Sequence, residues 1–95
     1  MHFSLVFHTD ALADWQRLDN GVKNAFKKKL EKRLVSPVVP ADRLSGKLSD
    51  CFKIKNRSSG HRLIYTVLEK TSVVFVLAIG KREDFDAYER AKTRI

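Results

Sequence analysis

The sequence predicts an α+β fold: a small antiparallel or mixed β-sheet with helices packed on one of its faces, in the order β-α-α-β-β-β-α. Three observations lead to this prediction. The 95 residues suffice for one hydrophobic core, and therefore for one domain over residues 1–95. Two segments near the N-terminus repeat apolar residues at helical spacing. Three strand-like runs, separated by short polar turns, follow them.

The first strand and the first helix are expected close to the N-terminus. In residues 2–8 apolar side chains alternate with polar or smaller ones, which is typical of a half-buried strand. Thr9 or Asp10 is a suitable cap for the helix that follows. The apolar stripe of this helix includes Trp15, which we expect in the core.

The segment DNG at 19–21 separates this helix from a longer one, which Asp19 or Asn20 can cap. The buried seam of the second helix recurs every four residues and consists of Val22, Phe26, Leu30 and Leu34. Its other face is basic and carries Lys23, Lys27, Lys28, Lys29, Lys32 and Arg33. Pro37 follows directly after the predicted end of this helix.

The loop after the second helix is predicted to be extended, with a turn at Gly46. Three strands then form an antiparallel meander and cover residues 51–56, 62–68 and 73–79. The third of these, VVFVLAI, is apolar on both faces, as expected of a central strand.

A short charged helix is expected after Gly80, with Phe85, Tyr88 and Ile95 along one side. These residues offer little apolar surface to hold the helix in place. We therefore expect it to be mobile or to dock on a partner.

The positive charge of the chain is concentrated in its middle. The formal net charge is +8. Residues 22–67 contain 12 Lys and Arg but three acidic residues, whereas the rest of the chain contains 7 basic and 8 acidic residues. Such a concentration indicates a polyanionic partner, most often a nucleic acid, and the alternative is a solvated basic face without a specific partner.

The single cysteine, Cys51, has no partner for an internal disulfide, which favours the reducing cytoplasm. Because no histidine is visibly placed to activate it, we expect a small buried residue rather than a nucleophile. The N-terminus does not resemble a signal peptide, and the longest apolar run, at 73–79, is too short to span a bilayer. No association with a membrane is therefore expected.

Several cations are predicted to converge around the turn RSSG. Whether its loop consists of the two serines or of all four residues 57–60, Asn56 pairs with His61 and Lys55 pairs with Arg62. Lys53 is then diagonal to Arg62 on the same face, and His61 faces the other side of the sheet.

The next turn, EKTS, extends this prediction to the third strand of the meander. If it pairs Leu68 with Val73, Ile79 lies beside Arg62. Lys81 and Arg82 then emerge at the same end of the sheet, and the register alone leaves open which of them turns towards the other cations.

Such crowding of like charges is unfavourable unless an anion completes it, and a phosphate is the obvious candidate. Neighbouring positive charges also lower the pKa of a lysine, which lets it accept a proton, while the other cations stabilise negative charge on a phosphate oxygen. The sequence shows no clustered metal ligands and no glycine-rich phosphate loop. We therefore expect any nuclease activity to need no metal and no cofactor, which favours RNA because its own 2′-hydroxyl can act as the nucleophile. The alternative is a solvent-facing strand surface without catalysis.

Four stretches resemble the RelE family of bacterial toxins: FKKKLEKRLVSP, DCFKIKNRSSGHRLIYTV, VVFVLAIGKRE and a tyrosine in the last helix. The resemblance extends from the Trp15 helix to Arg94. It implies a RelE-like fold and the toxin of a type II toxin–antitoxin system. It further implies a metal-independent endoribonuclease that cleaves mRNA in the A site of the 70S ribosome and so inhibits translation. The implied partners are a RelB-like antitoxin, mRNA and ribosomal RNA.

The resemblance also marks five catalytic candidates: Lys53, Lys55, Arg62, Arg82 and Tyr88. In this family's mechanism Lys55 is the general base, Arg82 the general acid, and Arg62 and Lys53 stabilise the phosphorane. Tyr88 stacks on the substrate base. RNA contacts are expected from eight further residues: Lys23, Lys27, Lys28, Lys29, Lys32, Arg33, Lys47 and Lys81.

Two positions depart from the family pattern. Ser45 stands where an arginine is expected, and His61 stands where a tyrosine is expected. Two other functions also remain open: a ParE-like toxin that acts on DNA gyrase, and a non-catalytic RNA-binding module. The joint presence of the lysines, arginines and tyrosine argues against the ParE-like toxin. A Lys55→Ala substitution distinguishes the nuclease from the RNA-binding module, because such a module needs no particular lysine. For the toxin, we expect the antitoxin to displace the C-terminal helix.

Overall fold

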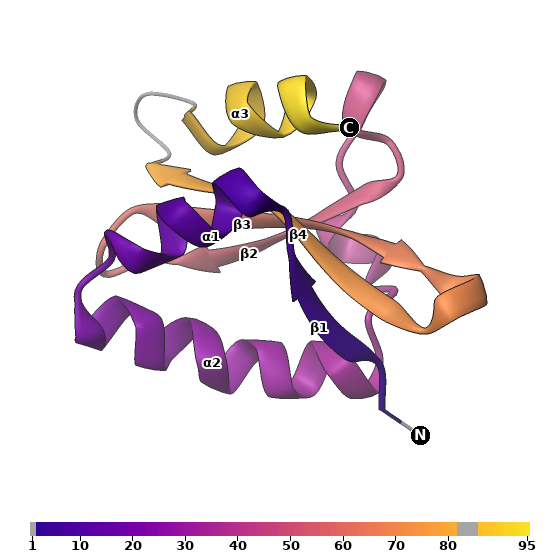
Figure 1. The fold of residues 1–95 in the computed structure, drawn as a ribbon, viewed down its shortest axis with the longest axis horizontal. Coiled ribbons are helices and arrows are strands. Elements are labelled where there is room, and N and C mark those ends of the chain that lie inside the picture. The colour runs from indigo at the N-terminus through magenta and orange to yellow at the C-terminus, as the bar shows by residue number, and fades with distance from the viewer. Residues whose placement is uncertain (1, 82–85) are drawn as a thin grey trace.

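The computed structural model describes residues 2–81 and 86–95 (Figure 1). Its helices and strands follow in the order β1 (Ser4–Phe7), α1 (Thr9–Gln16), α2 (Asn20–Val35), β2 (Cys51–Asn56), β3 (His61–Leu68), β4 (Val73–Lys81) and α3 (Asp86–Arg94). Short 3₁₀ turns lie at η1 (Pro40–Asp42), η2 (Gly46–Leu48) and η3 (Glu69–Thr71). The predicted α+β class and the order of the elements are confirmed.

The four strands form one mixed sheet in the order β1-β4-β3-β2. The strands β2, β3 and β4 make the predicted antiparallel meander, and β1 adds to it in parallel with β4. Because β1 pairs β4 only from Ser4 to Phe7, opposite Val73 to Val76, no strand among residues 2–81 and 86–95 pairs with the later part of β4 on that side.

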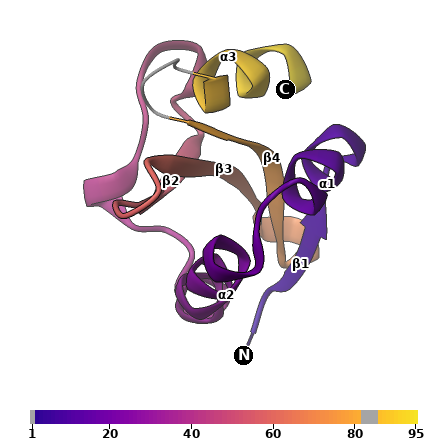
Figure 2. The same cartoon turned by 90° about the vertical axis from the view of Figure 1, so that its left-hand side faces the viewer.

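The helices cover both faces of the sheet, so the predicted packing on one face is wrong (Figure 2). Both α1 and α2 contribute to the core on one face, around Phe26, Leu63 and Tyr65. The opposite face carries α3, whose Ala87 and Ala91 pack on the β3–β4 surface. The physical reason lies in β4, which is apolar on both faces and therefore needs cover on both.

The two N-terminal helices are capped by side chains at their first turns. The Oδ1 of Asp19 accepts a hydrogen bond of 2.9 Å from the Val22 amide, which confirms Asp19 as one of the two predicted caps of α2. The cap of α1 is His8, whose Nδ1 accepts from the Asp10 amide at 3.1 Å. The predicted caps Thr9 and Asp10 are wrong because helical backbone already begins at Thr9.

A β-bulge changes the register between β3 and β4. Leu68 pairs with Val73 as predicted, but the register shifts between Ile64 and Tyr65. Arg62 therefore lies opposite Gly80, and the predicted pairing with Ile79 is wrong. The extra residue of a bulge is unpaired in the ladder and moves all following side chains by one position.

The helix α3 is held by smaller side chains than predicted. Ala87 and Ala91 are fully buried, whereas Ile95 is 63% exposed and does not line the buried side. Tyr88 is partly buried against the same cluster. Phe85, the third residue of the predicted apolar side, lies outside the described residues.

Candidate active site

The hairpin of β2 and β3 has the register that the sequence predicts. Asn56 pairs with His61 and Lys55 with Arg62, while Lys53 lies opposite Ile64. The loop 57–60 closes with the Gly60 amide donating to the Asn56 carbonyl at 2.9 Å. Gly60 has a φ of +75°, a conformation that a residue with a Cβ rarely adopts. The register places the three cations Lys53, Lys55 and Arg62 on the face of the sheet that carries α3.

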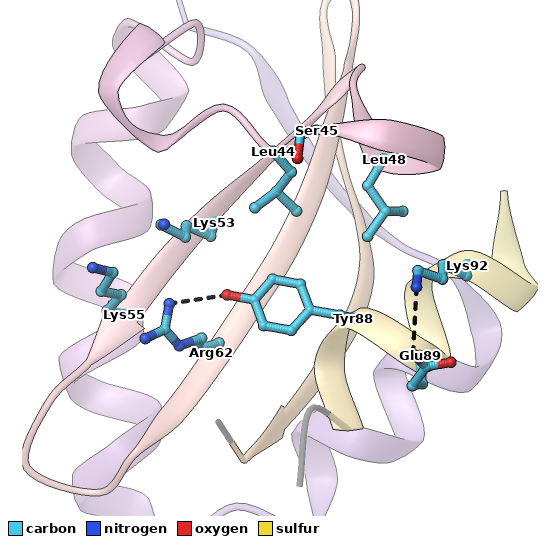
Figure 3. A pocket seen from close by; sticks show the side chains of 9 residues that line it. All are labelled: Leu44, Ser45, Leu48, Lys53, Lys55, Arg62, Tyr88, Glu89 and Lys92. Carbon is cyan, nitrogen blue, oxygen red and sulfur yellow. Dashed lines mark hydrogen bonds and ion pairs between the residues drawn. The ribbon is translucent and has the colours of Figure 1, made fainter. Parts of the chain in front are cut away.

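These cations line an open cavity of about 570 Å³ between β2, β3, α3 and the loop before β2 (Figure 3). Its lining residues are Leu44, Ser45, Leu48, Lys53, Lys55, Arg62, Tyr88, Glu89 and Lys92. Four of the five predicted catalytic residues thus lie around one cavity. The fifth, Arg82, lies outside the described residues.

Arg62 and Tyr88 are joined directly. The guanidinium Nη1 of Arg62 donates to the Tyr88 hydroxyl at 2.9 Å, and its Cζ lies 5.9 Å from the centre of the tyrosine ring. Arg62 is only 8% exposed, although arginine is seldom buried without partners. The contact orients both side chains at the cavity (Figure 3).

The electrostatics of the cavity act on Lys55. The pKa of Lys55 is lowered from its ordinary value, first by Lys53 and next by Arg62, with smaller contributions from burial and from Arg57. Asp42 opposes this shift. The direction is the one that a proton acceptor needs.

Several lining residues were not predicted to belong to the site. Leu44 and Leu48 reach the cavity from the loop before β2, and Glu89 and Lys92 reach it from α3. Lys92 forms an ion pair of 3.4 Å with Glu89. Residues four apart share a helix face, so Lys92 could have been found from Tyr88, whereas no sequence signal marks the two leucines.

Lys81 and His61 lie on the other face of the sheet. Lys81 pairs with His61, which itself pairs with Asn56, and this places both away from the Lys55–Arg62 face. This confirms the prediction that His61 faces the other side of the sheet from Arg62. Its Nδ1 lies 2.9 Å from the Ser59 hydroxyl, and burial, followed by the charge of Lys81, lowers the pKa of the imidazole.

The basic side chains of α2 divide into two kinds. Arg33 has a structural role, because it binds Asp42 at 2.5 Å and the Tyr65 hydroxyl at 2.8 Å. Lys29 donates to the carbonyl of Lys55. The remaining basic residues of α2 are Lys23, which is half-buried, and Lys27, Lys28 and Lys32, which are exposed.

A groove of about 350 Å³ connects α2 with the outer strand. It is lined by Lys29, Lys32, Arg33, Asp42, Ile54, Lys55 and Arg57. Since Lys55 lines both this groove and the larger cavity, the basic surface continues around the edge of β2. Lys47 is exposed on η2, between two lining residues of the cavity. RNA binding by these basic residues stays a prediction.

Cys51 is buried, and burial together with Asp50 raises its pKa to about 11. The thiol is thus in the unreactive form at neutral pH, as predicted. In residues 2–81 and 86–95, no three His, Cys, Asp or Glu side chains are grouped so that they could hold a metal ion. No helix in this part of the chain has the length and apolar character needed to cross a bilayer.

The chain is similar in sequence to known toxins of type II toxin–antitoxin systems. Residues 5–84 match the family model described as ParE toxin of type II toxin-antitoxin system, parDE. The mRNA interferase toxin RelE of Escherichia coli K12 is 45% identical over 95 residues, which cover 100% of this chain and 99% of the relative.

Solved structures agree with this relationship. A free arginine double mutant of E. coli RelE superposes with a TM-score of 0.89 at 44% identity, over 100% of this chain and 99% of that chain. The toxin in the intact E. coli RelBE toxin–antitoxin complex superposes with a TM-score of 0.79 at 46% identity, over 83% of this chain and 95% of that chain.

Proposed function

The chain belongs to the RelE family of type II toxin–antitoxin toxins, and we propose that it is a ribosome-dependent endoribonuclease, an mRNA interferase. It cleaves mRNA in the ribosomal A site, inhibits translation in the cytoplasm and is neutralised by a RelB-like antitoxin. The observation that carries this proposal is the cavity in which Lys53, Lys55, Arg62 and Tyr88 surround one site.

In the proposed reaction the 2′-hydroxyl of the RNA attacks the adjacent phosphorus. Lys55 accepts the hydroxyl proton, for which its lowered pKa is suited. The bond from phosphorus to the 5′-oxygen breaks, which leaves a 2′,3′-cyclic phosphate and a 5′-hydroxyl. Arg82 is assigned as the donor of the proton that this oxygen gains, by resemblance to the family.

Arg62 and Lys53 stabilise the negative charge that develops on the phosphorane oxygens. Arg62 is suited to this role because its planar guanidinium is already oriented by the Tyr88 hydroxyl. A charged donor that is fixed before the reaction needs little reorganisation in the transition state.

The wall formed by Tyr88 and the two leucines is suited to a nucleobase. Leu44 and Leu48 line the same cavity as the tyrosine ring (Figure 3). A base that stacks on an aromatic ring gains about 1–3 kcal/mol. Stacking here holds the nucleotide so that its phosphate lies among the cations.

The proposal is tested by replacing Lys55 with alanine. We expect cleavage of mRNA on translating ribosomes to fall by at least about 100-fold, because a positioned general base contributes this much, whereas ribosome binding falls only modestly. Cleavage is measured by primer extension in a translation extract, with and without ribosomes, and binding by co-sedimentation.

The matched control is Lys70→Ala, which removes an exposed lysine in η3, at the opposite end of β3 from Arg62. It should cleave like the wild type. Undiminished cleavage by the Lys55→Ala variant contradicts its role as the base. Inhibition of DNA supercoiling by purified gyrase, without cleavage of mRNA, identifies a ParE-like toxin instead.

A further inference from the structure

A buried carboxylate on α1 is bound by two arginines of the C-terminal helix. The side chain of Asp14 is 1% exposed. Its Oδ1 accepts from Arg90 at 3.0 Å and its Oδ2 accepts from Arg94 at 2.7 Å. Arg90 and Arg94 are four residues apart and therefore share one face of α3. Arg17, the C-cap residue of α1, adds a bond of 2.7 Å to Oδ1.

Asp14, Arg90 and Arg94 also form hydrogen bonds with backbone groups at the unpaired edge of β4. Past the end of β1, the Ile79 amide donates to Asp14 Oδ2 at 3.2 Å, and the Ile79 carbonyl accepts from Arg90 at 2.7 Å. The Leu77 carbonyl accepts from Arg94 at 2.9 Å. Buried backbone groups need such partners, so this arrangement ties α1, β4 and α3 together at one point.

This attachment matters for the cavity because Tyr88 lies on α3. Among the described residues of α3, the fully buried apolar side chains are Ala87 and Ala91, the smallest that have a Cβ, and Tyr88 is partly buried beside them. The hydrophobic effect scales with the buried area, so two alanines hold the helix only weakly. The charged contacts with Asp14 therefore add a directional attachment to the helix that carries the Tyr88 hydroxyl.

We propose that Asp14 is a positioning residue of the active site: through Arg90 and Arg94 it holds α3 so that the Tyr88 hydroxyl binds Arg62. Asp14 lines no part of the cavity and acts only through the helix. The effect on cleavage rests on the proposed function, whereas the effect on the position of α3 does not.

The first test is Asp14→Asn, which keeps an acceptor for the Ile79 amide but removes the negative charge that binds both arginines. We expect the amides of residues 86–94 to exchange at least about tenfold faster, since removing one partner of a buried ion pair is strongly destabilising. The matched control, Arg17→Ala, removes a bond to the same carboxylate from a side chain that is 68% exposed and does not belong to α3. It should leave exchange and cleavage unchanged.

The second test is a double-mutant cycle with Tyr88→Ala, measured as kcat and KM of mRNA cleavage on ribosomes. Alone, Asp14→Asn should lower kcat by about tenfold or more, in proportion to the loss of correctly placed tyrosine. In the Tyr88→Ala background it should cause no further loss, because the residue through which it acts is absent. Equal losses in both backgrounds would show a general loss of folded protein and overturn the proposal.

If Asp14→Asn does not fold, Arg90→Met replaces it, because Arg90 is 36% exposed and its loss leaves the Arg94 contact in place. The same pattern is expected, with a smaller change. Unchanged exchange of α3 in a folded variant overturns the role of Asp14, whether or not the protein cleaves RNA. Absence of mRNA cleavage by the wild type instead contradicts the proposed function and leaves the exchange measurement to decide on Asp14.

Discussion

The chemistry of Lys55 depends on its neighbours on one face of the sheet. Lys53 precedes it by two residues on β2, Arg62 lies opposite on β3, and both lower its pKa. An ammonium group with two cations beside it releases its proton more easily than an isolated one. The same cations attract the substrate phosphate, so binding and proton transfer have a common electrostatic origin.

The dependence of cleavage on pH follows from this arrangement. As a base, Lys55 acts when deprotonated, so the rate should rise with pH through its pKa and level off above it. Lys53→Met removes the largest cause of the lowered pKa, so the pKa of Lys55 rises and the midpoint of the profile moves to higher pH. Single-turnover rates from pH 6 to 10 measure this midpoint.

The control for this measurement is Lys70→Met, which removes a lysine outside the cavity and should leave the midpoint unchanged. If Lys53→Met lowers the rate equally at every pH and the midpoint does not move, Lys53 does not set the pKa of Lys55. Its role is then only to stabilise negative charge in the transition state.

At the scale of elements, the approach of α3 to the sheet depends on Gly80. A Cβ at this position would lie 2.6 Å from the Cβ of Asp86 and 2.7 Å from the amide nitrogen of Ala87. These are backbone and near-backbone atoms of the first turn of α3, so they cannot move aside without moving the helix. Gly80 also lies opposite Arg62, which places this contact next to the active cavity.

Gly80→Ala should therefore move α3 away from β4. Forcing an additional carbon into a packed contact costs about 1–3 kcal/mol of stability. Urea denaturation should show this loss, and cleavage should fall with it because Tyr88 moves with the helix. The control is Gly21→Ala in α2, whose Cβ would meet only the side-chain Oδ1 of Asp19 at 3.3 Å. It should retain wild-type cleavage, and wild-type cleavage by Gly80→Ala would contradict the role of the contact.

At the scale of the whole molecule, the fold separates two basic surfaces and joins them at the edge of β2. The active cavity lies on the α3 face, and the exposed lysines lie on α2, which covers the opposite face (Figure 2). The groove that contains Lys29, Lys32 and Arg57 connects them. Two surfaces around one edge are suited to a large polyanionic partner that contacts both sides of the protein, such as the ribosomal RNA of the proposed function.

The lysines of α2 should therefore act on binding rather than on chemistry. In a Lys27→Gln, Lys28→Gln, Lys32→Gln triple variant, the slope of log affinity for ribosomes against log salt concentration should decrease by about 2–3, since each lost phosphate contact contributes somewhat less than one. The maximal cleavage rate at saturating ribosomes should stay unchanged. Replacing Arg17 and Lys70 with glutamine serves as the control, because neither lies on α2. If the maximal rate of the triple variant fell as much as its affinity, the α2 lysines would act on the chemical step as well as on binding, which contradicts the prediction.

The sequence alone determined the features that arise from neighbouring residues. The alternation of side chains and the length of the RSSG turn set the pairing of Lys55 with Arg62, because a short hairpin loop permits few registers. The seam of α2 and its Asp19 cap follow from helical spacing within a single segment. The crowding of Lys53, Lys55 and Arg62 therefore follows from the sequence alone.

The tertiary structure decided what depends on residues far apart in the chain. Four features have no signal in the neighbouring sequence. They are the β-bulge next to Ile64, the packing of α3 on the second face of the sheet, the ion pair of Arg33 with Asp42, and the position of Leu44 in the wall of the cavity. Asp14 reaches Ile79 across 65 positions and Arg94 across 80. Such contacts follow from how the elements pack and share their buried polar groups, which no pattern within one segment encodes.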